Sequence, residues 1–246
     1  MATLGDDQII SLILISSLIA VSMAKDLLDR GGLFAALGVG LVVSLLGHWT
    51  WMVVLMTFLI VGSIATKWRF EEKSAFSVEE ANDGVRGWKN VLANGGVASL
   101  LAIINFLADG YDWAYFLLCS AVSVAASDTL ASEIGSLDPR TRIITTLEAV
   151  PAGTNGGMSP TGTLAALYGA LLIALISTVL GAVTRDPTPT LFMFTFVTII
   201  GWLGCQIDSL LGALLENRGL IGKHGVNFVS TLSGSLIALL AASRFL

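Results

Sequence analysis

The chain has 246 residues, of which 54% are hydrophobic and 13% charged, and its mean hydropathy is +0.82. About a quarter of the residues in a soluble domain are charged, so this composition excludes a water-soluble fold and predicts one integral-membrane domain over residues 1–246. The formal net charge of −5, with no basic tract, excludes nucleic acid as a partner.

The first apolar segments follow an acidic N-terminus. Residues 1–7 contain two aspartates and no Lys or Arg, unlike the basic start of a signal peptide, so we expect the first helix, Gln8–Ala24, to remain in the mature protein. The next charge-free stretch, Gly31–Thr66, exceeds the about 20 residues that cross a bilayer. Gly47-His48-Trp49 provides a turn that divides it into two helices.

Five further helices follow. The charge-free run from Trp113 to Ser127 is too short for a span, so its helix should continue to about Gly135. A glycine-rich segment opens the run from Ala149, which leaves one helix from about Pro160. The sequence therefore predicts an all-α, polytopic membrane protein with about eight transmembrane helices, the last five at residues 90–108, 113–135, 160–184, 187–207 and 225–243.

The basic residues predict the orientation of these helices. With alternating crossings, eleven of the 13 Lys and Arg residues fall on one side, and only Arg185 and Arg244 fall on the other. The positive-inside rule makes the first side cytosolic and puts both termini outside. The longer connections, at residues 67–94, 128–160 and 208–225, lie on the cytosolic side, where we expect the functional chemistry.

Two carboxylates, Asp128 and Asp208, occur at the cytosolic ends of predicted spans. Ionisable groups at that depth are costly unless they face water, a partner or an ion, and Mg²⁺ commonly bridges one or two carboxylates to substrate phosphates. Glu133 follows Asp128 after about 140° of helical rotation, so both reach one metal only if the helix bends. The alternative for Glu133 is an ion pair with Arg140 or Arg142.

A glycine-rich segment, Gly153 to Gly162 (GTNGGMSPTG), leads directly into a predicted helix. Glycines let backbone amides approach an anion, Ser159 suits the N-cap, and Pro160 suits the first helical position. The helix N-terminus adds a partial positive charge, so the segment predicts a phosphate cradle facing the cytosol. The alternative is a loop that only caps the helix, and no Walker-A motif is present because the segment lacks lysine.

The same arrangement is weaker at the cytosolic starts of two other predicted spans, at Asn94-Gly95-Gly96 and at Gly225-Val226-Asn227. All three helices start on the cytosolic side, so their positive dipole ends could hold several anionic groups together. The alternative is that glycine is simply common near the ends of transmembrane helices.

Arg86 and Lys89 precede the fourth predicted span. They are three residues apart, so on a helix they share a face and could clamp phosphate oxygens, with Trp88 anchored at the interface. The alternative is a basic interfacial helix that is attracted to anionic lipid.

Four segments together resemble the integral-membrane phytyl-phosphate kinases of tocopherol biosynthesis and their prokaryotic relatives. The resemblance covers residues 83–246 and is specific only in combination. Its segments are Gly87–Ala98 (GWKNVLANGGVA), Ser127–Gly135 (SDTLASEIG), Gly153–Gly162 (GTNGGMSPTG) and Gly204–Ala213 (GCQIDSLLGA).

The chain is also distantly similar to dolichol kinase and to CDP-lipid synthases. Asp128 and Asp208 match the two acidic stretches that hold metal and CTP in those enzymes. Glu148 resembles the glutamate of their Lys-Thr-x-Glu-Gly run, whose lysine is missing here.

The resemblance implies transfer of a γ-phosphoryl group from a nucleoside triphosphate to a prenyl monophosphate, such as phytyl or geranylgeranyl phosphate, to give the diphosphate. CTP is the expected nucleotide and Mg²⁺ the expected cofactor. The expected partners are the prenyl-phosphate lipid, the nucleotide and membrane lipids, and the oligomeric state stays open. Two alternatives are a cytidylyltransferase that forms CDP-lipid and a non-enzymatic transporter of anionic lipids.

Specific residues are assigned to each of these roles. The expected catalytic residues are Asp128, Asp208, Arg86 and Lys89, and the expected metal ligands are Asp128, Glu133 and Asp208. The expected nucleotide- and phosphate-binding residues are Asn94, Gly95, Gly96, Ser132, Gly153, Thr154, Asn155, Gly156, Gly157, Ser159, Gly162 and Asn227.

Overall fold

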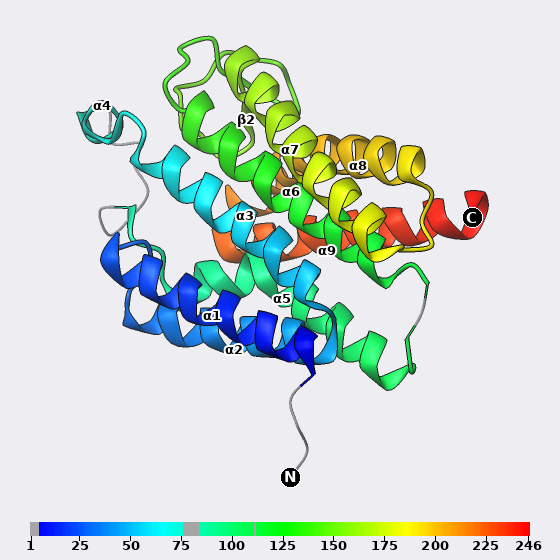
Figure 1. Cartoon of the computed structure of the whole chain (residues 1–246). Coiled ribbons are helices and arrows are strands. Elements are labelled where there is room, and N and C mark those ends of the chain that lie inside the picture. Colours follow the sequence, from blue (N-terminus) through cyan, green and yellow to red (C-terminus); the bar gives the residue numbers. More distant parts are fainter. Residues whose placement is uncertain (1–4, 76–83, 111) are drawn as a thin grey trace.

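A computed structural model describes residues 5–75, 84–110 and 112–246. Over these residues the chain forms a bundle of long helices (Figure 1). Residue 83, where the family resemblance begins, and residues 1–4 of the acidic N-terminus lie outside the described part. In chain order the elements are α1 (Asp6–Ala24), α2 (Arg30–Leu46), α3 (Trp49–Lys67), α4 (Phe70–Ala75), α5 (Trp88–Leu107), α6 (Ala114–Gly135), β1 (Arg142–Ile143), β2 (Gly157–Met158), α7 (Pro160–Thr184), α8 (Thr190–Leu211), the π-helical turn η2 (Gly212–Glu216) and α9 (Lys223–Phe245).

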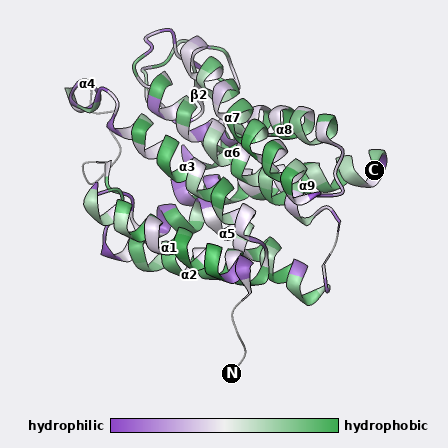
Figure 2. Ribbon diagram, in the orientation of Figure 1, coloured by the Kyte–Doolittle hydropathy of each residue, from purple (hydrophilic) through white to green (hydrophobic). Residues whose placement is uncertain are grey.

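Seven of the described helices are long and apolar enough to cross a membrane. The remaining long helix, α2, is apolar but has only 17 residues. Apolar residues cover most of the long helices, and hydrophilic residues gather in the connections near α4 and β2 (Figure 2). The predicted all-α, polytopic membrane architecture is confirmed, with two short strands added in the connection between α6 and α7.

The long apolar stretch near the N-terminus is divided at His48, as its sequence predicts. α2 ends at Leu46 and α3 begins at Trp49. The His48 side chain accepts a hydrogen bond from the Thr50 backbone amide at 3.3 Å and so caps α3. Burial lowers the pKa of His48, which favours the neutral imidazole that can accept this bond.

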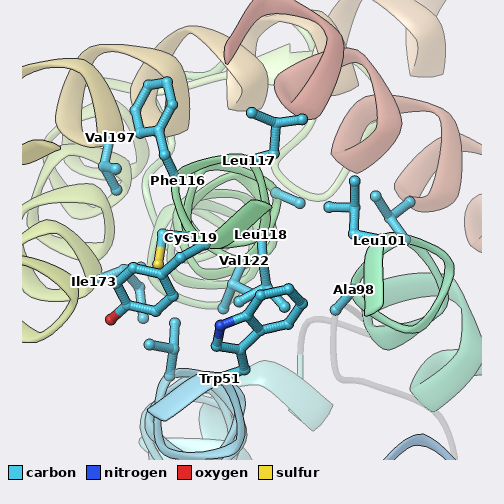
Figure 3. Close-up of a cluster of buried hydrophobic side chains, with 14 of the residues drawn as sticks. Trp51, Ala98, Leu101, Phe116, Leu117, Leu118, Cys119, Val122, Ile173 and Val197 are labelled. Carbon is cyan, nitrogen blue, oxygen red and sulfur yellow. The ribbon is translucent and has the colours of Figure 1, made fainter. Parts of the chain in front are cut away.

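Helix α6 is the centre of the bundle. Nearly all of its residues are buried, and it packs against α3, α5, α7, α8 and α9. Its side chains Phe116, Leu118 and Val122 extend from α6 among the surrounding helices (Figure 3). Other helices, and not lipid, therefore surround α6 on nearly every side, and its buried residues include polar ones such as Ser120 and Ser123.

Glycines bring α7 and α8 close to α6 near the site. A Cβ atom on Gly204 would lie 2.2 Å from Cγ2 of Val124, and one on Gly169 would lie 2.9 Å from the carbonyl oxygen of Ala126. Neither distance is possible for a real side chain, so these positions require glycine. Small residues at such contacts let transmembrane helices approach closely, which sets the position of the ends of α6 and α8.

Helices α1 and α9 start and end the described chain at the same end of the bundle (Figure 1). The other end carries α4, β1, β2 and the connections α1–α2, α3–α5, α6–α7 and α8–α9; we call it the site end. This arrangement agrees with the alternating crossings that the charge pattern predicts. The assignment of the site end to the cytosol stays a prediction.

Candidate functional site

A polar cavity of about 200 Å³ lies at the site end, between the last turns of α6 and α8. The α6–α7 connection and the first turns of α7 and α9 close its other sides. Its lining includes Asp128, Ser132 and Glu133 of α6, residues 153–159, Gly162 and Thr163, Gln206, Asp208 and Ser209 of α8, Glu216 of η2, and Lys223 and Asn227 of α9.

Asp128 and Asp208 are neighbours in this cavity. They come from α6 and α8, 80 residues apart in sequence, and their carboxyl groups interact directly. The hydroxyl of Ser230, on α9, donates a hydrogen bond to Oδ2 of Asp208 at 2.8 Å and orients that carboxylate. The structure therefore brings together the two carboxylates that the sequence marks separately.

The π-helical turn η2 directly follows α8 and changes the path of the chain beside the cavity. It begins at Gly212, whose backbone lies against Gly156 of the α6–α7 connection. Single π-helical turns are rare in proteins, and those that occur are often found at functional sites. Glu216, the last residue of the turn, lines the cavity.

The glycine-rich segment wraps one wall of the cavity. Gly153 and Gly156 have φ values of +81° and +77°, which side-chain-bearing residues rarely adopt. A Cβ on Gly156 would lie 2.5 Å from Cβ of Ala213, so this glycine also permits the contact with η2. Antiparallel pairing of β1 with β2 holds the segment in place.

The end of this segment caps α7, as predicted. The Ser159 hydroxyl accepts a hydrogen bond from the Gly162 amide at 3.1 Å, and Pro160 is the first helical residue. Every residue from Gly153 to Ser159 lines the cavity, together with Gly162. The capping role is therefore observed, and the location of the segment is compatible with a phosphate cradle, which stays a prediction.

The prediction that Asn94, Gly95 and Gly96 bind phosphate at the N-terminus of a helix is wrong. Helix α5 starts at Trp88, so these residues lie inside it and not at its N-terminus, and they do not line the cavity. A Cβ on Gly95 would meet Val39 of α2 at 3.0 Å, which identifies this glycine as a packing residue. Tertiary packing, and not an anion, accounts for the glycines.

The prediction that Asn227 precedes the last helix is wrong, but its expected place near the other site residues is found. The helix begins at Lys223, so Asn227 lies in its second turn rather than in a loop before it. Asn227 is 7% exposed and lines the cavity with Lys223. Among the described residues of the lining, Lys223 is the only cation, and the sequence analysis assigned it no role.

Glu133 lines the cavity, but its carboxylate oxygens are engaged elsewhere. Oε2 accepts a hydrogen bond from Nζ of Lys73 at 2.6 Å, and Oε1 accepts one from the Thr66 hydroxyl at 2.7 Å. The alternative pairing of Glu133 with Arg140 or Arg142 is therefore wrong, and its metal role stays a prediction. Lys73 belongs to α4, whose position against α6 no local pattern in the sequence reveals.

Arg86 and Lys89 do not form the predicted clamp. Arg86 precedes α5, and its backbone pairs with Leu27 through a hydrogen bond of 3.1 Å from its amide. Its guanidinium is buried over the ring of Phe58 and near the Thr66 hydroxyl, outside the cavity. Lys89 is exposed, with Nζ over the ring of Trp88, so neither residue reaches the proposed phosphates.

Asp138, which has no predicted role, supports the α6–α7 connection and the start of α7 beside the cavity. Its carboxylate accepts hydrogen bonds from Nε of Arg140 at 2.9 Å and from the Thr161 hydroxyl at 2.8 Å. The Arg140 guanidinium, together with Thr161, holds the pKa of Asp138 well below its usual range. A charged Asp138 thus stabilises the N-terminus of α7, and the Asp138-Pro139-Arg140 run was its signal in the sequence.

No group of three or more His, Cys, Asp or Glu side chains that could hold a metal ion occurs among the residues the structure describes. The cavity offers instead two adjacent carboxylates and the oxygen-bearing side chains of Gln206, Ser209 and Asn227. Two like charges at this proximity repel each other, and a divalent cation between them would remove the repulsion. The donor set fits Mg²⁺, which prefers oxygen ligands and retains positions for water and phosphate.

The fold and the cavity define a class: a polytopic α-helical integral membrane protein with an acidic, loop-covered cavity at one end of its bundle. Within that class, the chain belongs to the integral membrane protein family DUF92, whose model matches residues 13–235. The resemblance drawn from the four sequence motifs is confirmed at the level of the family.

Three relatives extend over most of the chain. The membrane protein MJ0933 of Methanocaldococcus jannaschii is 33% identical over 93% of this chain and 92% of its own length. Protein PGR of Arabidopsis thaliana is 30% identical over 98% of this chain and 99% of its own length. The chloroplastic protein VTE6 of Arabidopsis thaliana is 28% identical over 80% of this chain and 62% of its own length. No solved structure matches the chain significantly.

Proposed function

We propose that the protein is a membrane kinase that transfers the γ-phosphoryl group of a nucleoside triphosphate, with CTP as the expected nucleotide, to a prenyl monophosphate. An oxygen of the lipid phosphate bonds to the γ-phosphorus as the bond to the β–γ bridging oxygen breaks, so the products are a lipid diphosphate and a nucleoside diphosphate. The observation that carries the proposal is the meeting of Asp128, Asp208 and the Gly153–Gly162 segment in one cavity at the end of a membrane bundle.

The carboxylates of Asp128 and Asp208 would hold Mg²⁺ in this proposal. When bound, the ion neutralises charge on the transferring phosphoryl group. Ser230 keeps the Asp208 carboxylate in place through its hydrogen bond of 2.8 Å, so the ligand geometry is set before substrate arrives. Glu133 and Lys73 support the wall of the cavity and are not assigned to the metal.

The glycine-rich segment and two helix N-termini would bind the phosphates. The segment around Gly156 and the first turn of α7 line the cavity, so the positive end of the α7 dipole lies beside it, and Lys223 contributes a positive charge from the start of α9. Asn227 adds an amide side chain next to Lys223. These groups take over the role that the sequence analysis gave to Arg86 and Lys89.

A strong general base is not needed for this reaction. The acceptor oxygen belongs to a phosphate that is already an anion at neutral pH, so the protein has mainly to position two anions and offset their repulsion. The absence of a histidine from the described cavity lining is consistent with that requirement.

A cytidylyltransferase that forms CDP-lipid is the second candidate, because Asp128 and Asp208 also match the acidic stretches of the CDP-lipid synthases. It would use nearly the same groups, but attack would occur at the α-phosphorus and release diphosphate. The two reactions differ in their lipid product, so the product decides between them.

The test is incubation of the purified, membrane-reconstituted protein with prenyl monophosphates of several chain lengths and with CTP or ATP, followed by mass spectrometry of the lipids. A prenyl diphosphate is the expected product. Asp128→Asn and Asp208→Asn should lose most of this activity. Asp26→Asn is their matched control and should keep it, since Asp26 is exposed in the α1–α2 connection at the site end. A CDP-lipid would establish the second candidate, and no lipid product with any combination would refute both.

A further inference from the structure

A second concavity lies beside the polar cavity, on the outer side of α7 and α8. It is an open groove of about 720 Å³ formed by the two helices and the α6–α7 connection. Met158, Ser159 and Thr163 line both the groove and the polar cavity. A single layer of residues therefore separates the two spaces.

The groove is amphipathic along its length. Leu164 and Leu167 of α7 and Trp202 of α8 form an apolar floor, while Arg140 and Arg142 lie at its loop end. The indole of Trp202 donates a hydrogen bond to the carbonyl oxygen of Thr163 at 3.2 Å, which fixes this wall. A tryptophan with its polar edge so bound is typical of the membrane interface.

The two arginines keep a positive charge at the loop end of the groove. Arg140 is paired with the carboxylate of Asp138, and one nitrogen of Arg142 donates a hydrogen bond to the Leu147 carbonyl oxygen at 2.7 Å. Each guanidinium has five N–H donors, so both retain donors beyond these contacts. Two cations and one carboxylate leave a net positive charge, which suits an anionic headgroup.

We infer that this groove is the docking site of the lipid monophosphate that the proposed kinase phosphorylates. The isoprenoid tail lies along Leu164, Leu167 and Trp202, in contact with the bilayer, and the phosphate lies near Arg140 and Arg142. The lipid then enters from the side, and Ser159, which lines both spaces, lies between its phosphate and the polar cavity. The inference rests on the proposed function and adds the location and direction of the acceptor.

Another apolar pocket is a weaker candidate for the tail. It lies between α1, α2, α3 and α5 and is much smaller than the groove, about 50 Å³ against about 720 Å³. Its lining includes Leu55 and Met56, and Arg86 at its end is already packed on Phe58. A prenyl chain does not fit there without separating the helices.

Photo-crosslinking tests the location without requiring turnover. A prenyl monophosphate with a diazirine in its tail is added to membranes that contain the protein, and crosslinked peptides are mapped by mass spectrometry. We expect crosslinks around Leu164, Leu167 and Trp202 that unlabelled prenyl monophosphate displaces. Displaceable crosslinks at Leu55 or Met56, or none that displace in the groove, would overturn the inference.

Two variants with matched controls test the groove by kinetics. Leu164→Trp fills it, and Leu175→Trp adds the same bulk on the exposed face of α7 outside it. We expect Leu164→Trp to raise the KM for the lipid about tenfold, the effect of exposing about two methylene groups, with the KM for the nucleotide unchanged. Equal KM values for the lipid in the two variants would contradict binding of the lipid in the groove.

The charge at the loop end is tested in the same way. Arg142→Gln should raise the KM for the lipid, whereas Arg218→Gln, an exposed arginine in the α8–α9 connection, should not. Crosslinking in the groove by an inactive protein would leave the inference standing and refute the proposed function. Kinase activity without crosslinks in the groove would refute the inference and leave the proposed function standing.

Discussion

Nζ of Lys73 lies 2.6 Å from Oε2 of Glu133, in an ion pair from which solvent is excluded. The same ammonium donates to the carbonyl oxygens of Ala65 and Thr66, at the end of α3, at 3.1 and 2.7 Å. Lys73 is fully buried. One side chain thus joins α3, α4 and α6, and it holds in place the α6 turn that carries Glu133 into the wall of the cavity.

Lys73→Met should destabilise the protein by about 3 kcal/mol, because removal of one partner leaves the other as an uncompensated buried charge. Thermal unfolding in detergent measures the change. In Lys73→Met/Glu133→Gln the loss should be largely recovered. The exposed pair Arg69 and Glu72 is the control, and Arg69→Gln should have little effect. Equal effects at the two sites would contradict the structural role of Lys73.

Gly204→Ala should destabilise the packing of α8 on α6 by about 1–3 kcal/mol, since the added methyl group would overlap Val124. Gly38 of α2 is the matched control, because a Cβ there meets no atom within 4 Å. Gly38→Ala should therefore leave the midpoint of thermal unfolding unchanged or raise it slightly. The account of the α6–α8 contact fails if the two variants have the same midpoint.

Asp138→Asn should lower thermal stability at neutral pH, because the amide cannot reproduce the charge that Arg140 and the start of α7 stabilise. The folded state lowers the pKa of Asp138 below its ordinary value of 3.8, so the stabilisation is present above that value and is lost as the pH falls through the folded pKa. The difference in unfolding midpoint between wild type and variant should be constant above about pH 5 and narrow below about pH 4. A difference that does not depend on pH would contradict the assignment.

The sequence predicts the membrane fold well because lipid imposes strong constraints. Span lengths, the division at His48 and the cap at Ser159 are local properties, and each is found in the structure. Asp128 and Asp208 are expected to meet because both lie toward the end of a span on the same predicted side, which limits where their side chains can be. The alternation of the spans thus predicts from sequence alone that these two distant residues lie at the same end of the bundle.

Other parts of the site depend on contacts between distant segments, which no local pattern encodes. The burial of Lys73 against Glu133 and the pairing of Arg86 with Leu27 are of this kind. Asn94 lies in the second turn of α5, because the helix continues through the charged residue Lys89 and begins at Trp88. Lys223 has the sequence context of an ordinary interfacial lysine, and only the folded position of the α9 start brings it to the cavity.

Mn²⁺, which can replace Mg²⁺ and is visible by electron paramagnetic resonance, should bind the protein in the absence of nucleotide. Asp128→Asn should weaken binding by at least about tenfold, since changes to groups that merely support metal ligands already cost that much. Glu133→Gln should affect binding less than Asp128→Asn, because the Glu133 oxygens are engaged by Lys73 and Thr66. Equal Mn²⁺ affinities of wild type and Asp128→Asn would contradict a metal site at Asp128.

Transfer of label from γ-labelled CTP or ATP to a prenyl monophosphate tests the central claim most directly. Wild-type protein should place the label in the lipid diphosphate, and Asp128→Asn or Asp208→Asn should slow the transfer by about 10²-fold or more while the midpoint of unfolding is retained. Label found only in free diphosphate, or wild-type rates in both variants, would contradict a kinase whose phosphoryl transfer depends on this pair of carboxylates.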